Sequence, residues 1–384
     1  VKELLHTAEL LRKEHWAKQK NTGINYISSN DFSFYDMVLD TAVLLGIIPN
    51  RYKELHLSEL DTYFAMARGY QGDFGDVKAL AMKKWFNTNY HYIVPEIDDN
   101  VSIKLSGNKI WNEYAEAKEQ GIETKPVVIG AYTMLKLCRY TGKQSAENYV
   151  EAMIKAYREL IEKCEENQIS WIQFDEPSLV QDMNKKDIEL FHKIYDNLLT
   201  SIKTSKVLLQ TYFGDIRDVY LDLIKMPFAG IGLDFIEGKE TYNLIKEYGF
   251  PKDKLLFAGL INGKNIWRND YNKTLNILEE LKALIEPENI VINTSCSLLH
   301  VPYTLENETK LDESYKKHFS FAKEKLNELN ELKKITEGKG KDLLENNIKL
   351  FEERLGEKSN VLDKKDEKLF TRLPERKVRK NIQK

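Results

Sequence analysis

Short apolar runs recur along the chain and predict a series of parallel strands. Each run is rich in β-branched residues and ends at polar residues or glycine, and most are followed by roughly 15–30 residues of helical periodicity. Amphipathic helices are predicted over residues 146–167 and 185–204, between strands. The seven predicted strands cover residues 24–29, 126–129, 170–174, 206–210, 230–235, 254–260 and 290–293. This alternation of strand and helix is typical of an α/β fold with a parallel sheet.

Seven such units are one fewer than a closed (β/α)8 barrel contains. The chain opens directly in a helical stretch of the kind that follows a first strand, so either that strand lies before Val1 or the barrel is open. A doubly wound sheet gives the same alternation, but no G-x-G-x-x-G fingerprint follows any predicted strand. We therefore predict a TIM-type (β/α)8 barrel whose first strand is absent from this chain.

A long insertion after the second barrel strand, at about residues 37–124, far exceeds the ~2–6 residues of an ordinary βα loop. Its first part is predicted to be helical and to end in the sequence KALAMKKWFNTNYHYIVPEI. The following sequence, VSIKLSGNKIW, predicts a hairpin with a Gly-Asn turn. Insertions of this size usually carry function.

The last part of the chain differs in composition from the rest. From about Lys333 the sequence is charged and poor in aromatic residues, which indicates a solvated helical arm or interdomain linker. We thus divide the chain into a barrel domain, residues 1–332, and a linker, residues 333–384, that leads toward a second barrel.

The overall charge and the cysteines narrow the class of partner. The 57 Lys and Arg residues nearly balance the 60 Asp and Glu residues, so neither nucleic acid nor a membrane is expected as a partner. The three cysteines lack CxxC spacing, which argues against a disulfide framework. No run approaches the roughly 18 apolar residues of a membrane span. We expect a soluble cytoplasmic protein that acts on a small polar metabolite.

Carboxylates and a cysteine close several of the predicted strands, at the barrel end where reacting groups lie. Asp175 and Glu176 precede Pro177, so at least one should point into the barrel mouth and hold an ammonium group or act as a base. Capping of the next helix, or pairing with Lys or Arg, is an equally weighted alternative. Asp234 and Glu237 could likewise take part in chemistry or serve as caps and ion-pair partners. For these two residues we favour the structural role.

Cys296 follows the last predicted strand, where a thiolate ligand for a metal could lie. A zinc site needs three or four converging ligands, and no second cysteine closes a strand. His300 lies four residues further along, in a predicted loop. We therefore expect Cys296 to be a small buried apolar residue or a relic, and we expect no metal ligand in this chain.

The densest cluster of polar and aromatic groups lies within residues 83–92. Lys84 offers a positive charge, and Asn87 and Asn89 offer directional hydrogen bonds to an anionic ligand. Trp85 or Tyr90 offers a flat face for a ring. These residues fit two structures equally well: a site for an anionic, ring-bearing ligand, or a helix end packed by aromatic side chains.

Five sequence signatures resemble those of cobalamin-independent methionine synthase, and the resemblance covers nearly the whole chain. They are KWFNTNYHYIVPE, IQFDEPSLV, FAGLINGKNIWR, TSCSLLHVP and FTRLPERK. The family has two (β/α)8 barrels, and this chain resembles the N-terminal barrel plus the start of the linker. The resemblance implies zinc-dependent methyl transfer from 5-methyltetrahydrofolate polyglutamate to homocysteine. It places zinc, homocysteine and all catalytic residues in the C-terminal barrel, so this chain alone should be inactive.

The resemblance also assigns roles to four positions. It implies that Lys84 and Asn89 bind the folate polyglutamate tail. Asp175 matches the aspartate that holds the homocysteine amine in the catalytic barrel, and Cys296 matches a zinc thiolate there. Because the strand over residues 206–210 is not followed by a His-x-Cys pair, we interpret Asp175 and Cys296 as a vestigial copy of that site.

Two other functions are weighed against this one. The first is a stand-alone folate-binding homologue without catalysis, which the linker-like sequence FTRLPERKVRKNIQK disfavours. The second is a glycosidase barrel that uses Asp175 or Glu176 together with Asp234 or Glu237. Nothing else in the sequence matches a glycosidase, so it is the least favoured.

Overall fold

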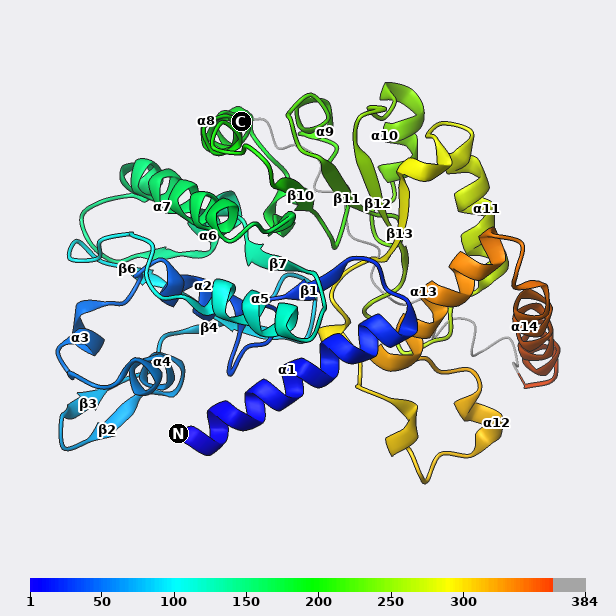
Figure 1. The fold of residues 1–384 in the computed structure, drawn as a ribbon, viewed down its shortest axis with the longest axis horizontal. Helices are drawn as coiled ribbons and strands as arrows, with labels where there is room; N and C mark the ends of the chain where they lie inside the picture. The colour runs from blue at the N-terminus through cyan, green and yellow to red at the C-terminus, as the bar shows by residue number, and fades with distance from the viewer. Residues whose placement is uncertain (362–384) are drawn as a thin grey trace.

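The centre of the molecule is a curled, seven-stranded parallel sheet (Figure 1). The computed structural model describes residues 1–361, and side chains as far as residue 353. All seven predicted strands are confirmed. In spatial order they are β1 (Ile27–Ser29), β7 (Thr124–Ile129), β9 (Trp171–Asp175), β10 (Lys206–Gln210), β11 (Gly230–Asp234), β12 (Leu255–Ile261) and β13 (Ile290–Thr294). Each pairs in parallel with its neighbour in this order.

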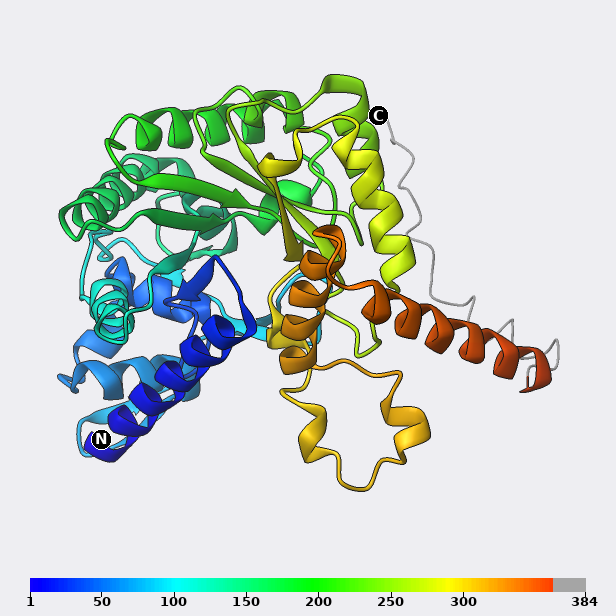
Figure 2. The ribbon, with the colours of Figure 1, turned by 45° about the vertical axis from the view of Figure 1, so that its right-hand side comes forward.

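The sheet is open between its two edge strands. Within the described residues β1 pairs only with β7, and β13 pairs only with β12. Helix α1 (Lys2–Thr22) contacts both β1 and helix α13 (Ala322–Thr336), and so lies across this opening (Figures 1 and 2). The indole of Trp16 fixes α1 to the edge by donating to the Ser28 carbonyl at 3.0 Å. The architecture is a TIM-like barrel that these seven strands leave open on one side.

Amphipathic helices cover the outer face of the sheet. Both predicted helices are present, as α7 (Ala146–Glu166) and α8 (Lys185–Leu199), and each begins with a capping box, at Ser145 and Asn184. The other barrel helices are α6 (Ala131–Leu137), α9 (Tyr220–Leu223), α10 (Thr241–Tyr248) and α11 (Tyr271–Lys282). Their apolar faces meet the sheet in one continuous core.

The insertion contains short helices and two hairpins rather than the predicted order of elements. Its helices are α2 (Met37–Leu44), α3 (Asn50–Lys53), α4 (Glu59–Arg68) and α5 (Lys109–Glu119). The first hairpin joins β2 (Tyr70–Gly72) to β3 (Gly75–Val77), and the second joins β4 (Met82–Lys84) to β5 (His91–Ile93). Strand β6 (Glu96–Ile97) pairs in parallel with β8 (Arg139–Tyr140).

Two predictions within the insertion are wrong. The sequence KALAMKKWFN does not end a helix, because β4 pairs with β5 and the packing of Trp85 against Tyr92 outweighs local helix propensity. Residues 101–111 do not form a hairpin. Val101 and Ile103 are buried in the main core, and the backbone of this stretch bonds to the Leu45 carbonyl, while the Gly-Asn pair leads into α5.

The C-terminal helices pack against the barrel. Helix α13 contacts β12 and β13, and helix α14 (Lys341–Val361) contacts α11. Asn347 accepts a hydrogen bond from the Tyr271 amide at 3.0 Å, so the first part of α14 is fixed to the barrel. The predicted boundary at residues 332–333 lies inside α13, and the division into domains stays a prediction. The FTRLPERK signature lies outside the described residues. None of the helices in residues 1–361 has the length and apolar character of a membrane span.

Candidate functional site

Asp175 ends β9 and belongs to a chain of hydrogen bonds inside the barrel. The carboxylate accepts from Gln173 Nε2 at 2.6 Å and from the Tyr212 hydroxyl at 3.1 Å, and Lys125 donates to the other end of Gln173. Burial raises the pKa of Asp175 to about 6, against the opposing effect of Gln173 and the Lys125 charge. Burial also lowers the pKa of Lys125 to about 8. Asp175 is therefore already partnered within the chain.

Asp175 is the only one of these four residues that the sequence pointed to, since Lys125, Gln173 and Tyr212 were not predicted as its partners. The predicted strand begins at Pro126 and so leaves Lys125 outside the sheet, whereas β7 begins at Thr124. Gln173 lies two residues before Asp175 and so points to the same side of β9. The two-residue period of a strand was the signal that could have found Gln173.

Glu176 has a different role from its neighbour. Its fully buried carboxylate accepts from the backbone amides of Tyr132 at 3.0 Å and Thr133 at 2.7 Å, and from the Tyr195 hydroxyl. Burial raises its pKa to about 7 although these hydrogen bonds favour the charged form. The capping alternative thus describes Glu176, but the capped helix is α6, which precedes the residue, and not the next helix along the chain.

Asp234 and Glu237 also divide between two roles. Asp234 is buried and accepts from the amides of Phe213 at 2.9 Å, Ile236 at 2.8 Å and Glu237 at 3.0 Å, so it shapes the loop after β11. Burial raises its pKa to about 6. Glu237 instead reaches outward and forms an ion pair with Lys264 at 2.8 Å. The Asp234 carboxylate thus accepts from backbone amides, whereas the Glu237 carboxylate pairs with side chains of other segments, Lys264 and Asn87.

Cys296 lies in the loop after β13 and is 4% exposed. Burial raises its pKa to about 12, so the thiol stays protonated at neutral pH. His300 packs against the rings of Phe213 and Tyr90, and burial lowers its pKa to about 4. Among residues 1–353 no three His, Cys, Asp or Glu side chains are grouped so that they could hold a metal ion. The donors around Cys296 therefore do not fit a zinc ion.

Lys84 and Asn89 are both exposed on the β4–β5 hairpin. Lys84 is the last residue of β4 and pairs with His91 across the hairpin, while Asn89 belongs to the turn. Within the described part of the chain Lys84 forms no ion pair. The hairpin thus presents an uncommitted ammonium group, whereas the charge of Lys264 is already neutralised.

The hairpin turn rests on the barrel mouth through three polar side chains, which we call the hairpin contact. Asn87 donates to Glu237 Oε2 at 2.6 Å and accepts from Lys264 Nζ at 2.9 Å, and Glu237 and Lys264 pair with each other. Residues separated by 150 and 177 positions in sequence therefore meet here. The structure brings the hairpin that carries Lys84 and Asn89 onto the mouth that contains Asp175 and Cys296.

Backbone strain occurs next to the same contact. Phe86 and Phe213 have φ values of 47° and 74°, a region that L-residues with bulky side chains rarely adopt. Their rings lie 5.8 Å apart, and Lys264 lies over the Phe213 ring at 5.1 Å. Strain of this kind costs about 1–3 kcal/mol per residue and is found where function or packing requires it. The packing here fixes the position of the hairpin relative to the mouth.

Comparison with known proteins identifies the family. Residues 1–286 match the family described as cobalamin-independent synthase, N-terminal domain. The chain belongs to the cobalamin-independent methionine synthases. A relative from Campylobacter jejuni subsp. doylei is 54% identical over 390 residues, which cover 100% of this chain and 51% of that protein. One from Lactococcus lactis subsp. lactis is 52% identical over 376 residues, which cover 97% of this chain and 49% of that protein.

Both relatives are named 5-methyltetrahydropteroyltriglutamate–homocysteine methyltransferase, and the chain spans about half of their length. Among solved structures, a B12-independent methionine synthase from Shewanella sp. in complex with selenomethionine superposes with a TM-score of 0.60. It is 15% identical, and the match covers 91% of this chain and 90% of that one. At that identity the likeness shows a shared fold.

Proposed function

We propose that this chain is the N-terminal half of a zinc-dependent methionine synthase, which transfers a methyl group from 5-methyltetrahydrofolate polyglutamate to homocysteine. The proposal is supported by relatives named for this reaction that are about twice as long. On this view zinc and homocysteine bind in a second barrel, and this half binds the folate tail and acts as a scaffold in the cytoplasm. The proposal includes an eighth strand between β1 and β13, since a TIM barrel has eight.

The observation that carries the tail-binding role is the exposed pair Lys84 and Asn89 on a hairpin held at the barrel mouth. Each glutamyl unit of a folate tail adds a carboxylate. An ammonium group attracts such a carboxylate, and an amide orients it by a directional hydrogen bond. A tail with several carboxylates therefore gains more from Lys84 than a single glutamate does.

The barrel mouth supports the assignment of catalysis to the other half. Asp175 is partnered by Gln173 and Tyr212, and Cys296 is a protonated thiol without companion ligands among the described residues. We propose that these two residues are remnants of a substrate and metal site. It follows that this chain, separated from the second barrel, is inactive.

The test compares two adjacent lysines in the complete enzyme. Lys84→Ala should raise KM for triglutamate folate about tenfold, as expected for losing one charge-assisted hydrogen bond, and change KM for monoglutamate folate less than about twofold. Lys83→Ala removes the same charge from the opposite side of the strand and is the matched control. The tail-binding role is wrong if Lys84→Ala affects both folates equally, or if Lys83→Ala has the same effect.

A further inference from the structure

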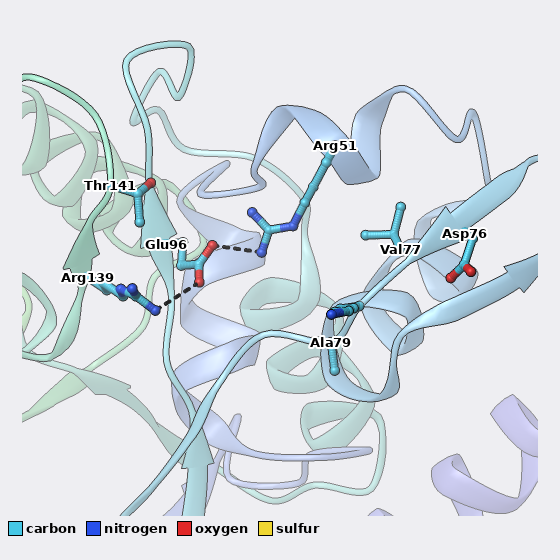
Figure 3. A pocket seen from close by; sticks show the side chains of 8 residues that line it. Arg51, Asp76, Val77, Ala79, Glu96, Arg139 and Thr141 are labelled. Carbon is cyan, nitrogen blue, oxygen red and sulfur yellow. Dashed lines mark ion pairs between the residues drawn. The ribbon is translucent and has the colours of Figure 1, made fainter.

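A charged pocket of about 510 Å³ lies between the insertion and the segment of β8, and none of the barrel-mouth residues described above lines it. Helix α3, strand β3 with the residues that follow it, and the β6–β8 pair surround it (Figure 3). Its charged lining consists of Arg51, Lys78 and Arg139, with Glu96 and Asp76 as the two carboxylates. Three cations and two carboxylates give this small surface a net positive charge, although the chain as a whole carries -3.

Glu96 lies between the two arginines and pairs with both. The β6–β8 register places Glu96 directly opposite Arg139. Arg51 Nη2 lies 2.7 Å from one carboxylate oxygen of Glu96, and Arg139 Nη1 lies 3.9 Å from the other (Figure 3). Glu96 is only 9% exposed, so its position is fixed by the surrounding structure. One buried carboxylate thus offsets the repulsion between two guanidinium groups.

Tyr52 connects Arg51 to the segment that carries Lys78. The Arg51 guanidinium lies over the ring of the buried Tyr52 at 4.7 Å, and the Tyr52 hydroxyl donates to the Lys78 carbonyl at 2.6 Å. The Lys78 side chain forms no ion pair within residues 1–353. The pocket therefore combines a closely held arginine, Arg51, and a more loosely paired one, Arg139, with a lysine that forms no ion pair among these residues.

The two guanidinium groups keep donors that face solvent. The Arg51 and Arg139 side chains are 40% and 63% exposed, and each guanidinium has five N–H donors, of which Glu96 occupies few. Planar donor forks match the oxygen pairs of phosphoryl and carboxylate groups. A single exposed ion pair gains little, whereas a ligand with two anionic groups can contact both arginines at once.

We propose that this pocket binds a small polyanion, carrying phosphoryl or carboxylate groups, through Arg51 and Arg139 with Lys78 at its rim. The site is separate from the tail-binding residues Lys84 and Asn89 and does not depend on the function proposed for them. Arg51 also pairs closely with Glu96, so its replacement would disturb the fold. Arg139 is more exposed and more loosely paired, and is the better residue to change.

Calorimetric titration of the protein with two probes tests the site. Pyrophosphate represents phosphoryl groups, and γ-linked triglutamate represents carboxylates. We expect saturable, salt-sensitive binding of pyrophosphate, of triglutamate at this pocket, or of both. Arg139→Ala should weaken the binding about tenfold, and Arg139→Lys by less, because lysine keeps the charge but lacks the fork. Lys155→Ala removes an exposed cation elsewhere, with a side chain 80% exposed, and should change binding less than about twofold.

The two probes also separate this site from the hairpin. Lys84→Ala should leave pyrophosphate binding unchanged, whatever it does to folate. The proposal is overturned if neither probe binds saturably, or if all saturable binding survives Arg139→Ala in a variant that keeps its thermal stability. Triglutamate binding that is lost with Lys84→Ala and kept with Arg139→Ala belongs to the hairpin and does not count as support.

Discussion

The barrel mouth and the β4–β5 hairpin both carry charged side chains, but they differ in how those charges are used. At the mouth, Asp175 and Asp234 are buried and accept hydrogen bonds from the chain itself. On the hairpin, Lys84 is exposed and forms no ion pair within the described residues. A strand-end carboxylate in a barrel therefore does not by itself indicate chemistry. The partners that it already has decide whether it is free to act.

The largest expected effect comes from removing a committed carboxylate. Glu176→Ala would leave two backbone amides and a buried hydroxyl without their acceptor, which should lower the free energy of unfolding by about 3 kcal/mol. Denaturant unfolding measures this. The matched control is Glu151→Ala, whose side chain is 74% exposed and which should cost less than about 1 kcal/mol. Unchanged stability after Glu176→Ala would mean that Glu176 is not structural.

The pH dependence of stability tests the buried, structural role of Glu176 in a second way. Burial raises the pKa of Glu176 from its ordinary value of 4.5 to about 7, so its stabilising contribution is complete below pH 4.5 and is lost as pH rises through 7. Glu176→Gln cannot titrate. Its stability relative to the natural protein should therefore rise by about 2 kcal/mol between pH 5 and pH 8. A pH-independent difference between the two proteins would contradict this assignment.

A smaller effect is expected where the two regions meet. Asn87→Ala removes two hydrogen bonds of the hairpin contact, and a loss of about 1 kcal/mol corresponds to roughly fivefold faster local opening. Hydrogen exchange at the Trp85 amide, which donates to the Tyr90 carbonyl at 2.8 Å, reports that opening. Amides of β9 and β10 serve as the internal control. If Trp85 exchanges no faster in the variant, the contact does not hold the hairpin.

The barrel could be predicted from the sequence because each of its strands is a local signal. An apolar, β-branched run such as residues 206–210 needs no knowledge of distant residues, and its predicted ends agree with β10. The alternating pattern of residues 101–111 was equally local and misled, because Val101 and Ile103 pack into the core instead of pairing with a neighbouring strand.

The arrangement of the site could not be predicted, because it depends on contacts between distant segments. Asn87 meets Glu237 across 150 residues, and neither local pattern indicates the other. The residue types at Lys84, Asn89, Asp175 and Cys296 were visible in the sequence. Which of them are exposed and which are already partnered became visible only in the folded chain.

The central claim is that this half binds the folate tail and does not form the metal site. Calorimetric titration of the chain with zinc, with and without homocysteine, and then with methyltetrahydrofolate triglutamate, tests it most directly. We predict no zinc binding and weak, salt-sensitive binding of the triglutamate. Tight stoichiometric zinc binding that strengthens with homocysteine would show that Cys296 belongs to a working site, and would contradict the division of roles between the two halves.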